Sequence, residues 1–316
     1  MFTTRKSQLA KKIVGCGVLL SMFLATSVSA QDSKTRRINC DGNNNKTINK
    51  LINKSNPGDT ILIRGTCFEN VDLNKGVTLN GNGVGVIVPA DSLAPTIRVS
   101  ARNATIKGLT IDAPKEGTQI LITDRSLATI ENNNIGNATI YGVAAFDMSS
   151  ASIVGNNIYN NGTGVFAVET STLRVGFKSM AANELLPNVI ENNNNGITIA
   201  RAFANISGNQ IINNTNIGVV IARTASARIA GNEISGNNIG IVNTTNSTTD
   251  LALSDDGVGL FGLPNFGVNT QLALFCNSGF TSGIVGPDFN PAIAQDSCES
   301  QLIFPVVPVP PPAPAP

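Results

Sequence analysis

The chain contains no histidine and no tryptophan, and only two of its 316 residues are tyrosine. Without histidine, neither a Ser-His-Asp nor a Cys-His catalytic set can form, and no proton transfer can use an imidazole. Zinc sites in proteins are built largely from histidine and closely spaced cysteine pairs, and the sequence has no Cys-x-x-Cys pair either. The chain also offers few aromatic rings on which a sugar could stack.

Basic charge is scarce once the first 30 residues are set aside. Residues 1–30 combine a basic start, an apolar run over residues 13–24 and the small-residue cleavage site Val28-Ser29-Ala30, which predicts a signal peptide. The apolar run is shorter than the roughly 20 residues of a spanning helix, so we expect export to the periplasm or the exterior and no membrane span. The remainder carries 18 Lys and Arg against 21 Asp and Glu, a net charge of −3, which disfavours nucleic acid as a partner.

Four cysteines remain in the exported chain: Cys40, Cys67, Cys276 and Cys298. An even number in an oxidising compartment predicts two structural disulfides. Closeness in the sequence favours pairing Cys40 with Cys67 and Cys276 with Cys298, and four cysteines permit three connectivities.

A short repeat organises the middle of the chain. Residues 204–242 carry one pattern twice, so that Ile206 corresponds to Ile229 and Asn209 to Asn232, and the pattern returns upstream near residues 128 and 151. A fixed short period is typical of stacked repeats, in which each unit buries its apolar side only against its neighbours. Three short strands and three turns account for one repeat, with about 4.8 Å between the parallel strands of successive coils.

Equivalent positions in successive repeats form columns. An apolar column is predicted to point inward, a glycine column to form turns with positive φ, and an asparagine column to form a side-chain amide ladder. A polar binding strip is the alternative role for the asparagines. The three columns are Ile130, Ile153, Ile206 and Ile229; Gly142, Gly164, Gly218 and Gly240; and Asn133, Asn156, Asn209 and Asn232.

The opening of the repeats resembles a known family. The runs GDTILI, GTCFENV and VTLNG within residues 58–81 are similar to the first coil of the pectin-lyase-like, right-handed parallel β-helix superfamily, although an aromatic residue is usual there at the position of Cys67. The resemblance implies an all-β, right-handed parallel β-helix. It implies no activity, because this architecture hosts lyases, hydrolases, esterases, adhesins and non-enzymatic proteins, and the activity motifs of its enzymes are absent here.

These observations divide the chain into five parts. After the signal peptide (1–30) we expect a lead-in with a short amphipathic helix that covers the open end of the stack (31–56). A β-helix of about eight coils follows (57–250), then an irregular, phenylalanine-rich C-terminal cap that shields the last strand edges (251–300). A proline-rich tail (301–316) completes the chain.

Two features depart from the repeat. The spacing from Gly164 to Gly196 is ten residues longer than usual, which places an insertion within residues 172–188. A charged residue stands five residues beyond each of Gly142, Gly164, Gly196 and Gly218. Together with Asp124 one coil earlier, these make a predicted column of three acids and two arginines: Asp124, Asp147, Glu169, Arg201 and Arg223.

The charged column is the one candidate site for chemistry. Carboxylates from adjacent coils suit Ca²⁺, which makes Asp124, Asp147 and Glu169 candidate metal ligands. Calcium-assisted β-elimination on an acidic glycan would then use Glu169, Arg201, Arg174 or Lys178. The alternative is a solvated edge whose surface ion pairs contribute little.

Because the recognised catalytic sets are missing, the sequence favours an exported, non-catalytic binding or surface scaffold. Its expected partner is a polysaccharide or another component of the cell envelope. Two alternatives remain: a calcium-assisted polysaccharide lyase or related carbohydrate-active enzyme, and an adhesin-like spacer.

Overall fold

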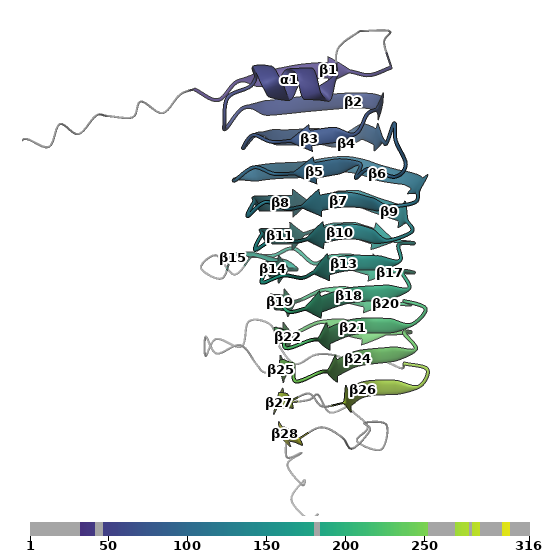
Figure 1. Cartoon of the computed structure of the whole chain (residues 1–316). Coiled ribbons are helices and arrows are strands. Elements are labelled where there is room, and N and C mark those ends of the chain that lie inside the picture. Colours follow the sequence, from purple (N-terminus) through teal and green to yellow (C-terminus); the bar gives the residue numbers. More distant parts are fainter. Residues whose placement is uncertain are drawn as a thin grey trace, which may run out of the picture. The chain divides into compact units, whose positions relative to one another are not determined.

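The computed structural model describes residues 32–41, 47–179, 184–251, 269–277, 280–284 and 299–303. Within residues 33–316 the chain winds through successive coils, each of which places parallel strands on the faces of one stack (Figure 1). This is the parallel β-helix that the repeat predicts. The predicted signal peptide and residues 304–316 of the predicted tail lie outside the described residues.

The stack has three faces, which the chain visits in the order face 1, face 2, face 3. Face 1 contains β8 (Leu127–Glu131), β11 (Ser150–Val154), β14 (Thr172–Val175), β19 (Phe203–Ser207), β22 (Ser226–Ala230), β25 (Thr248–Leu251), β27 (Phe280–Ile284) and β28 (Glu299–Ile303). Face 2 contains β9 (Asn134–Ala138), β12 (Asn157–Tyr159), β17 (Val189–Glu191), β20 (Gln210–Ile212) and β23 (Glu233–Ser235). Face 3 contains β3 (Val71–Leu73), β5 (Ile97–Val99), β7 (Thr118–Ile122), β10 (Tyr141–Ala145), β13 (Thr163–Ala167), β18 (Asn195–Ala200), β21 (Ile217–Ala222), β24 (Ile239–Thr244) and β26 (Leu272–Asn277).

The first coils are built from longer strands. β2 (Thr60–Phe68), β4 (Thr78–Val88) and β6 (Ala104–Lys115) begin in the ladder of face 1, and β6 ends in the ladder of face 2. β1 (Thr35–Asn39) pairs in parallel with β2, so the predicted lead-in contributes a strand of its own.

The predicted helix covers the N-terminal end of the stack beside β1 (Figure 1). α1 (Ile48–Lys54) begins at Thr47, whose side chain accepts a hydrogen bond from the Lys50 backbone N–H and so caps the helix. Ile48 and Ile52 are fully buried against the first coil, as their helical spacing requires. The Glu69 carboxylate accepts further hydrogen bonds from the first helical N–H groups, at 2.7 and 3.2 Å.

Isoleucine columns fill the interior. Ile130, Ile153, Ile206 and Ile229 are fully buried and stand in register, with Val175 completing the column between Ile153 and Ile206. Burying such a side chain contributes roughly 1.5–3 kcal/mol relative to an exposed one, so the repeated column is a main source of stability.

The asparagine column forms a continuous buried ladder at the turn between faces 1 and 2. Each side-chain amide donates from Nδ2 to Oδ1 of the next asparagine, at 2.8–3.0 Å, and that same oxygen also accepts the backbone N–H of the asparagine before it. The ladder runs through Asn133, Asn156, Asn188, Asn209 and Asn232. The sequence pattern did not identify Asn188, because the insertion lengthens the interval between it and Asn156.

A second ladder, which the sequence analysis missed, lies at the turn between faces 2 and 3. Its amides join neighbouring rungs with Nδ2–Oδ1 distances of 2.9–3.1 Å. The rungs are Asn161, Asn193, Asn214, Asn237 and Asn269. In the coils that both ladders span, two of the three turns are therefore tied to the neighbouring coils by side-chain amides.

The glycine column has a different cause from the one predicted. The expectation of positive φ at Gly142, Gly164 and Gly218 is wrong: these glycines lie at the second position of their strands and have no positive φ. A Cβ at each would come within 2.6–2.7 Å of the carbonyl oxygen of the next column glycine, and close to the amide of the second ladder. Close contact between coils therefore requires glycine here, whereas positive φ occurs at Gly155, Gly208 and Gly231.

The parallel pairing extends past Asp250. β26 pairs with β24, β27 with β25 and β28 with β27, so face 3 holds nine strands within the described part of the chain, one more coil than expected. Residues 301–303 of the predicted tail belong to β28. Most of the predicted C-terminal cap lies outside the described residues, and its boundaries stay a prediction.

One predicted disulfide is present. Cys40 and Cys67 are bonded, with their Cα atoms 5.1 Å apart, and they tie the end of β1 to β2. Cys276 in β26 is buried and also disulfide-bonded. Its predicted partner, Cys298, lies outside the described residues.

We predict that Asn156→Ala lowers the free energy of unfolding by about 3 kcal/mol or more, because it leaves several buried polar groups without partners at 1–3 kcal/mol each. Asn156 accepts from the Asn133 backbone and side chain and donates to Asn188 and to the Ile130 carbonyl oxygen. Urea unfolding followed by circular dichroism measures the loss. Asn134→Ala, at an exposed position one residue beyond the ladder, should change stability by no more than about 0.5 kcal/mol; equal losses in both variants would contradict a special role of the ladder.

Candidate functional site

The predicted charged column exists and lies at the third turn, between faces 3 and 1. Asp124, Asp147, Glu169, Arg201 and Arg223 all have φ between 48° and 60° there. Backbone hydrogen bonds between successive turns align them: Arg125 donates to the Asp147 carbonyl oxygen, Met148 to that of Glu169 and Thr170 to that of Arg201, at 2.7–3.1 Å. All five side chains are exposed. We call this row the charged edge.

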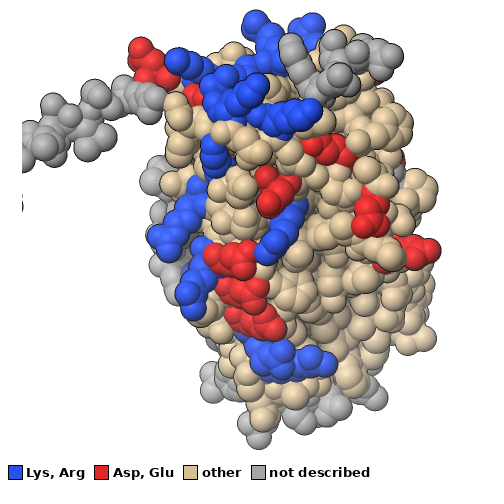
Figure 2. All heavy atoms as spheres, turned by 45° about the horizontal axis from the view of Figure 1, so that its top comes forward, with Lys and Arg blue, Asp and Glu red and all other residues tan. Residues whose placement is uncertain are grey.

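Local contacts favour the ionised form of Asp147. The Thr123 hydroxyl donates a hydrogen bond to Asp147 Oδ2. That bond lowers the pKa of Asp147 below its ordinary value; desolvation opposes the shift, and nearby Arg125 adds to it. Asp124 pairs with Arg98 of face 3 at 2.8 Å. On the face drawn in Figure 2, acidic side chains gather in a short line that ends against basic ones.

The three acids form a row rather than a cluster. Asp124, Asp147 and Glu169 line one shallow depression. Among the described residues, no three His, Cys, Asp or Glu side chains converge closely enough to hold a metal ion. The acids thus remain candidates for Ca²⁺ only as neighbouring carboxylates on an open edge, and calcium binding stays a prediction.

The insertion is a hairpin that leaves the stack after Val175. Thr172–Val175 continues the ladder of face 1 as β14. The extra residues therefore begin at Gly176, and not at residue 172, where the predicted range of the insertion begins. β15 (Phe177–Ser179) and β16 (Glu184–Leu185) pair antiparallel. Leu185 lies beside Gly208, at the turn between faces 1 and 2. The hairpin therefore stands at the edge of face 1, across that face from the charged edge.

Arg174 and Lys178 fix the base of the hairpin. The Arg174 guanidinium lies 5.4 Å from the centre of the Phe177 ring and donates to the Lys178 carbonyl oxygen at 2.9 Å. Lys178 pairs with Glu131 at 3.3 Å and with Glu184 at 3.7 Å. A hydrogen bond from the ammonium to Glu131 raises the pKa of Lys178. This lysine is consequently held as a cation.

The four catalytic candidates lie in two separate places. Glu169 and Arg201 belong to the charged edge, and Glu169 lines its depression. Arg174 lines a different hollow on face 1, and Lys178 belongs to the hairpin. The structure therefore brings Glu169 and Arg201 together on one edge and leaves Arg174 and Lys178 apart from them.

The hollow on face 1 is a groove that crosses five strands, from β6 to β19. Its floor is a column of outward polar side chains in register: Thr105, Thr129, Ser152, Arg174 and Asn205. A second column of Leu127, Ser150, Thr172 and Phe203 runs beside it, and Leu127 and Phe203 are 45% and 47% exposed. Ser152 Oγ and Asn205 Oδ1, on either side of Arg174, have no hydrogen-bond partner within the described part of the chain.

Sequence reasoning singled out Arg174 but missed the rest of this groove. Outward positions of a strand follow no period that folding requires, so Thr, Ser and Asn at these positions resemble any solvated surface. The one available signal was register: once the inward Ile153 is aligned with Val175, Ser152 and Arg174 necessarily become neighbours.

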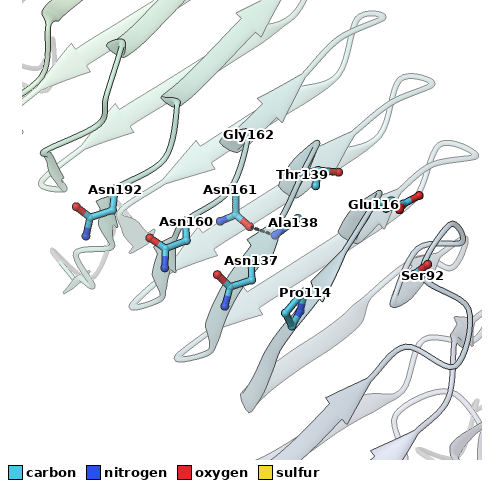
Figure 3. A pocket seen from close by; sticks show the side chains of 10 residues that line it. All are labelled: Ser92, Pro114, Glu116, Asn137, Ala138, Thr139, Asn160, Asn161, Gly162 and Asn192. Atoms are coloured by element: carbon cyan, nitrogen blue, oxygen red, sulfur yellow. Dashed lines mark hydrogen bonds between the residues drawn. The ribbon is translucent and has the colours of Figure 1, made fainter.

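A third hollow lies along the turn between faces 2 and 3 (Figure 3). Its asparagine side chains come from successive turns, and Asn137, Asn160 and Asn192 share a left-handed φ of 53–59°. Asn161, between them, accepts the Ala138 N–H at 3.0 Å and belongs to the second ladder. Asn137 donates to Asp112, which also accepts from the Tyr159 hydroxyl at 2.6 Å. Because these contacts already explain the turn, this hollow is best described as the outer side of a structural ladder.

For the charged edge we predict that Thr123→Val raises the pKa of Asp147 toward its ordinary value, because the variant removes the hydroxyl donor and keeps the shape. A carboxyl whose pKa is depressed by folding stabilises the protein above its unfolded-state pKa, and this stability is lost as the pH falls from about 4 through the folded pKa. Titration of the Asp147 carboxyl carbon by NMR measures the shift. The variant should also lose less stability than the parent below pH 4, and an unchanged titration would show that Thr123 does not control Asp147.

No helix among the described residues is long and apolar enough to cross a membrane. Among solved structures, the fold is similar to the crystal structure of alginate lyase from Paenibacillus sp. str. FPU-7. That alignment has a TM-score of 0.52 at 13% identity and covers 84% of this chain and 99% of the lyase. At this identity the similarity concerns the fold.

A curated relative, a cell surface glycoprotein of Methanothermus fervidus, is 30% identical over 127 residues. The match covers 40% of this chain and spans only about a fifth, 21%, of the length of that relative. The model of the family described as "right handed beta helix region" matches residues 95–255, half of the chain. With the parallel coils described above, this match shows that the protein belongs to the right-handed β-helix family.

Proposed function

We propose that this protein is an exported, non-catalytic scaffold that binds an acidic polysaccharide along face 1. The observation that carries the proposal is the groove whose polar floor holds the exposed Arg174 between Ser152 and Asn205; the buried Oγ and Oδ1 atoms of these two residues have no hydrogen-bond partner within the described part of the chain. A guanidinium binds a carboxylate through two parallel hydrogen bonds, and neighbouring hydroxyl and amide groups suit the hydroxyls of a sugar.

The dimensions of the groove suit an extended chain. Five strands at about 4.8 Å from one to the next make a floor of about 19 Å. The floor is straight because the polar side chains stand in register. Phe203 adds an exposed ring in the parallel column, where a sugar ring can pack. A linear glycan with one carboxylate near Arg174 therefore meets both an ionic and a nonpolar contact.

Two features favour binding over catalysis. Lys178 is held as a cation by Glu131, which makes it a poor general base at neutral pH. Glu169 and Arg201 belong to the charged edge rather than to the groove that holds Arg174. A β-elimination needs its base and its charge-neutralising groups around one sugar, and Arg174 and Lys178 lie apart from Glu169 and Arg201.

The comparisons agree with a role at the cell surface. One relative is named as a cell surface glycoprotein, and one structural neighbour is named as an alginate lyase. The predicted signal peptide and the disulfide between Cys40 and Cys67 fit export. These similarities support a polysaccharide partner and leave the individual glycan to experiment.

We predict that Arg174→Gln weakens binding of a polyuronate such as alginate about tenfold or more, because a hydrogen bond to a charged group contributes about 1.5–3 kcal/mol. Isothermal titration calorimetry measures the affinity, which should also fall as salt screens the guanidinium. Lys54→Gln at the end of α1 is the matched control: it removes the same charge at the capped end of the stack.

Equal binding by both variants, or tighter binding of a neutral glycan, would place the ligand elsewhere. Incubation of the parent chain with the polyuronate, with and without Ca²⁺, tests the enzymatic alternative through the absorbance of unsaturated product. If unsaturated product forms with the parent chain and does not form with Glu169→Ala or Arg201→Ala, the protein is a lyase and not a non-catalytic scaffold.

A further inference from the structure

The outer side of face 3 carries no charge over seven successive strands. β7, β10, β13, β18, β21, β24 and β26 contain no Asp, Glu, Lys or Arg, whereas faces 1 and 2 both carry ionised side chains. Folding requires only the inward residues of a strand to be apolar. Parallel strands that are apolar on both sides are typical of sheets that are covered on both sides. In Figure 2 a broad uncharged area extends beside the line of acidic side chains.

Large apolar side chains occupy this surface. Tyr141 and Phe166 stack with their ring centres 4.4 Å apart and an interplanar angle of 10°, and Phe146 packs against both. The rings bury Ala144, which lies outside the interior core. On the next strand, β18, the same outward rows hold the polar side chains of Asn195 and Thr198. Beyond it they continue as aliphatic side chains, namely Ile217, Val220, Ile239 and Val242. The face thus has an aromatic part at β10 and β13, a polar uncharged strand at β18 and an aliphatic part at β21 and β24.

The charged edge borders this face and changes sign along the stack. Asp147 and Glu169 follow the two aromatic strands β10 and β13, while Arg201 and Arg223 follow β18 and β21. The acidic part of the edge therefore accompanies the aromatic part of face 3, and the basic part accompanies β18 and the first aliphatic strand. The sign changes between β13 and β18, and the aliphatic side chains begin at β21.

We propose that face 3 binds face 3 of a second copy of this chain, with the two stacks antiparallel. A two-fold axis between β13 and β18, parallel to the strands, brings β13 opposite β18 of the second copy and β10 opposite β21. Tyr141 then meets Ile217, and Ala144 with its covering rings meets Val220. On the edge, Glu169 meets Arg201 and Asp147 meets Arg223, each pair occurring twice.

A second copy satisfies this surface better than other occupants do. Both partners repeat at the same strand spacing of about 4.8 Å, so their side-chain rows interdigitate along the whole face. A parallel arrangement requires a two-fold axis along the stack, which carries the charged edge of the second copy to the opposite side of the face and leaves both edges without a charged partner. The axis sets six of these strands, β7 to β24, against their counterparts. Strands of about five residues then cover about 450–500 Å² per copy, so the pair buries about 900–1,000 Å², in the range of weak, reversible interfaces. The groove on face 1 stays open in both copies.

Analytical ultracentrifugation of the full chain tests the proposal. We expect a reversible dimer whose dissociation constant rises about tenfold or more in Glu169→Arg and in Arg201→Glu, because each change creates two like-charge contacts. The double variant Glu169→Arg/Arg201→Glu should return to within about threefold of the parent. Val220→Asp should abolish the dimer by burying an unpaired carboxylate.

Glu191→Arg on face 2 makes the same charge change away from the interface and should leave the dimer unchanged. Circular dichroism confirms that each variant is folded. The proposal is overturned if the parent is monomeric at its highest soluble concentration, or if the single reversals leave its dissociation constant unchanged. It is equally overturned if the double variant dimerises as weakly as the single ones. If the parent is monomeric and binds the glycan, and the Val220→Asp variant does not bind it, then face 3 binds the glycan rather than a second copy.

Discussion

From Asn133 to Asn269, asparagine amides at two of the three turns of a coil tie that coil to the next. An amide can do this because it donates and accepts at once: its oxygen takes the N–H of one neighbouring rung while its nitrogen donates to the other. A carboxylate could only accept, and buried turns cannot leave backbone groups unpaired. Because both ladders are continuous, equivalent residues of successive coils are held in line. The columns of isoleucine, glycine and charge follow from that alignment.

The same constraint decides where the chain tolerates change. A hairpin enters between β14 and β17, yet Asn188 resumes the first ladder directly after it and joins Asn156 to Asn209. The coils beyond therefore keep their register, and Glu169 stacks on Arg201 despite the longer interval in sequence. The glycine column shows the converse: at Gly164 even one carbon atom would collide with the next coil. Additions are accommodated at the strand edge, where no neighbour lies in the way.

Features with a period could be predicted from the sequence, and features without one could not. Alignment of Ile206 with Ile229 was sufficient for the coil and its interior, and helical spacing of Ile48 and Ile52 located α1. A repeated glycine shows that a constraint exists but not which one. The sequence analysis therefore predicted positive φ at turns for the column glycines, whereas the actual constraint is close contact between coils. The second ladder and the face 1 groove remained hidden because Asn, Ser and Thr also occur at solvated turns and strand surfaces.

Outward positions therefore carry most of the functional information in a fold of this kind. The interior and the turns satisfy folding on their own, and a solvent-facing strand position needs only to avoid aggregation, which charged residues achieve most readily. The two outer surfaces differ sharply from that expectation: face 1 sets Arg174 among polar side chains, and face 3 carries no charge from β7 to β26. Folding gives no reason for either, because equivalent strands of one coil face the same interior. Each is explained by contact with something outside the chain, a charged polar ligand on one side and an apolar partner on the other.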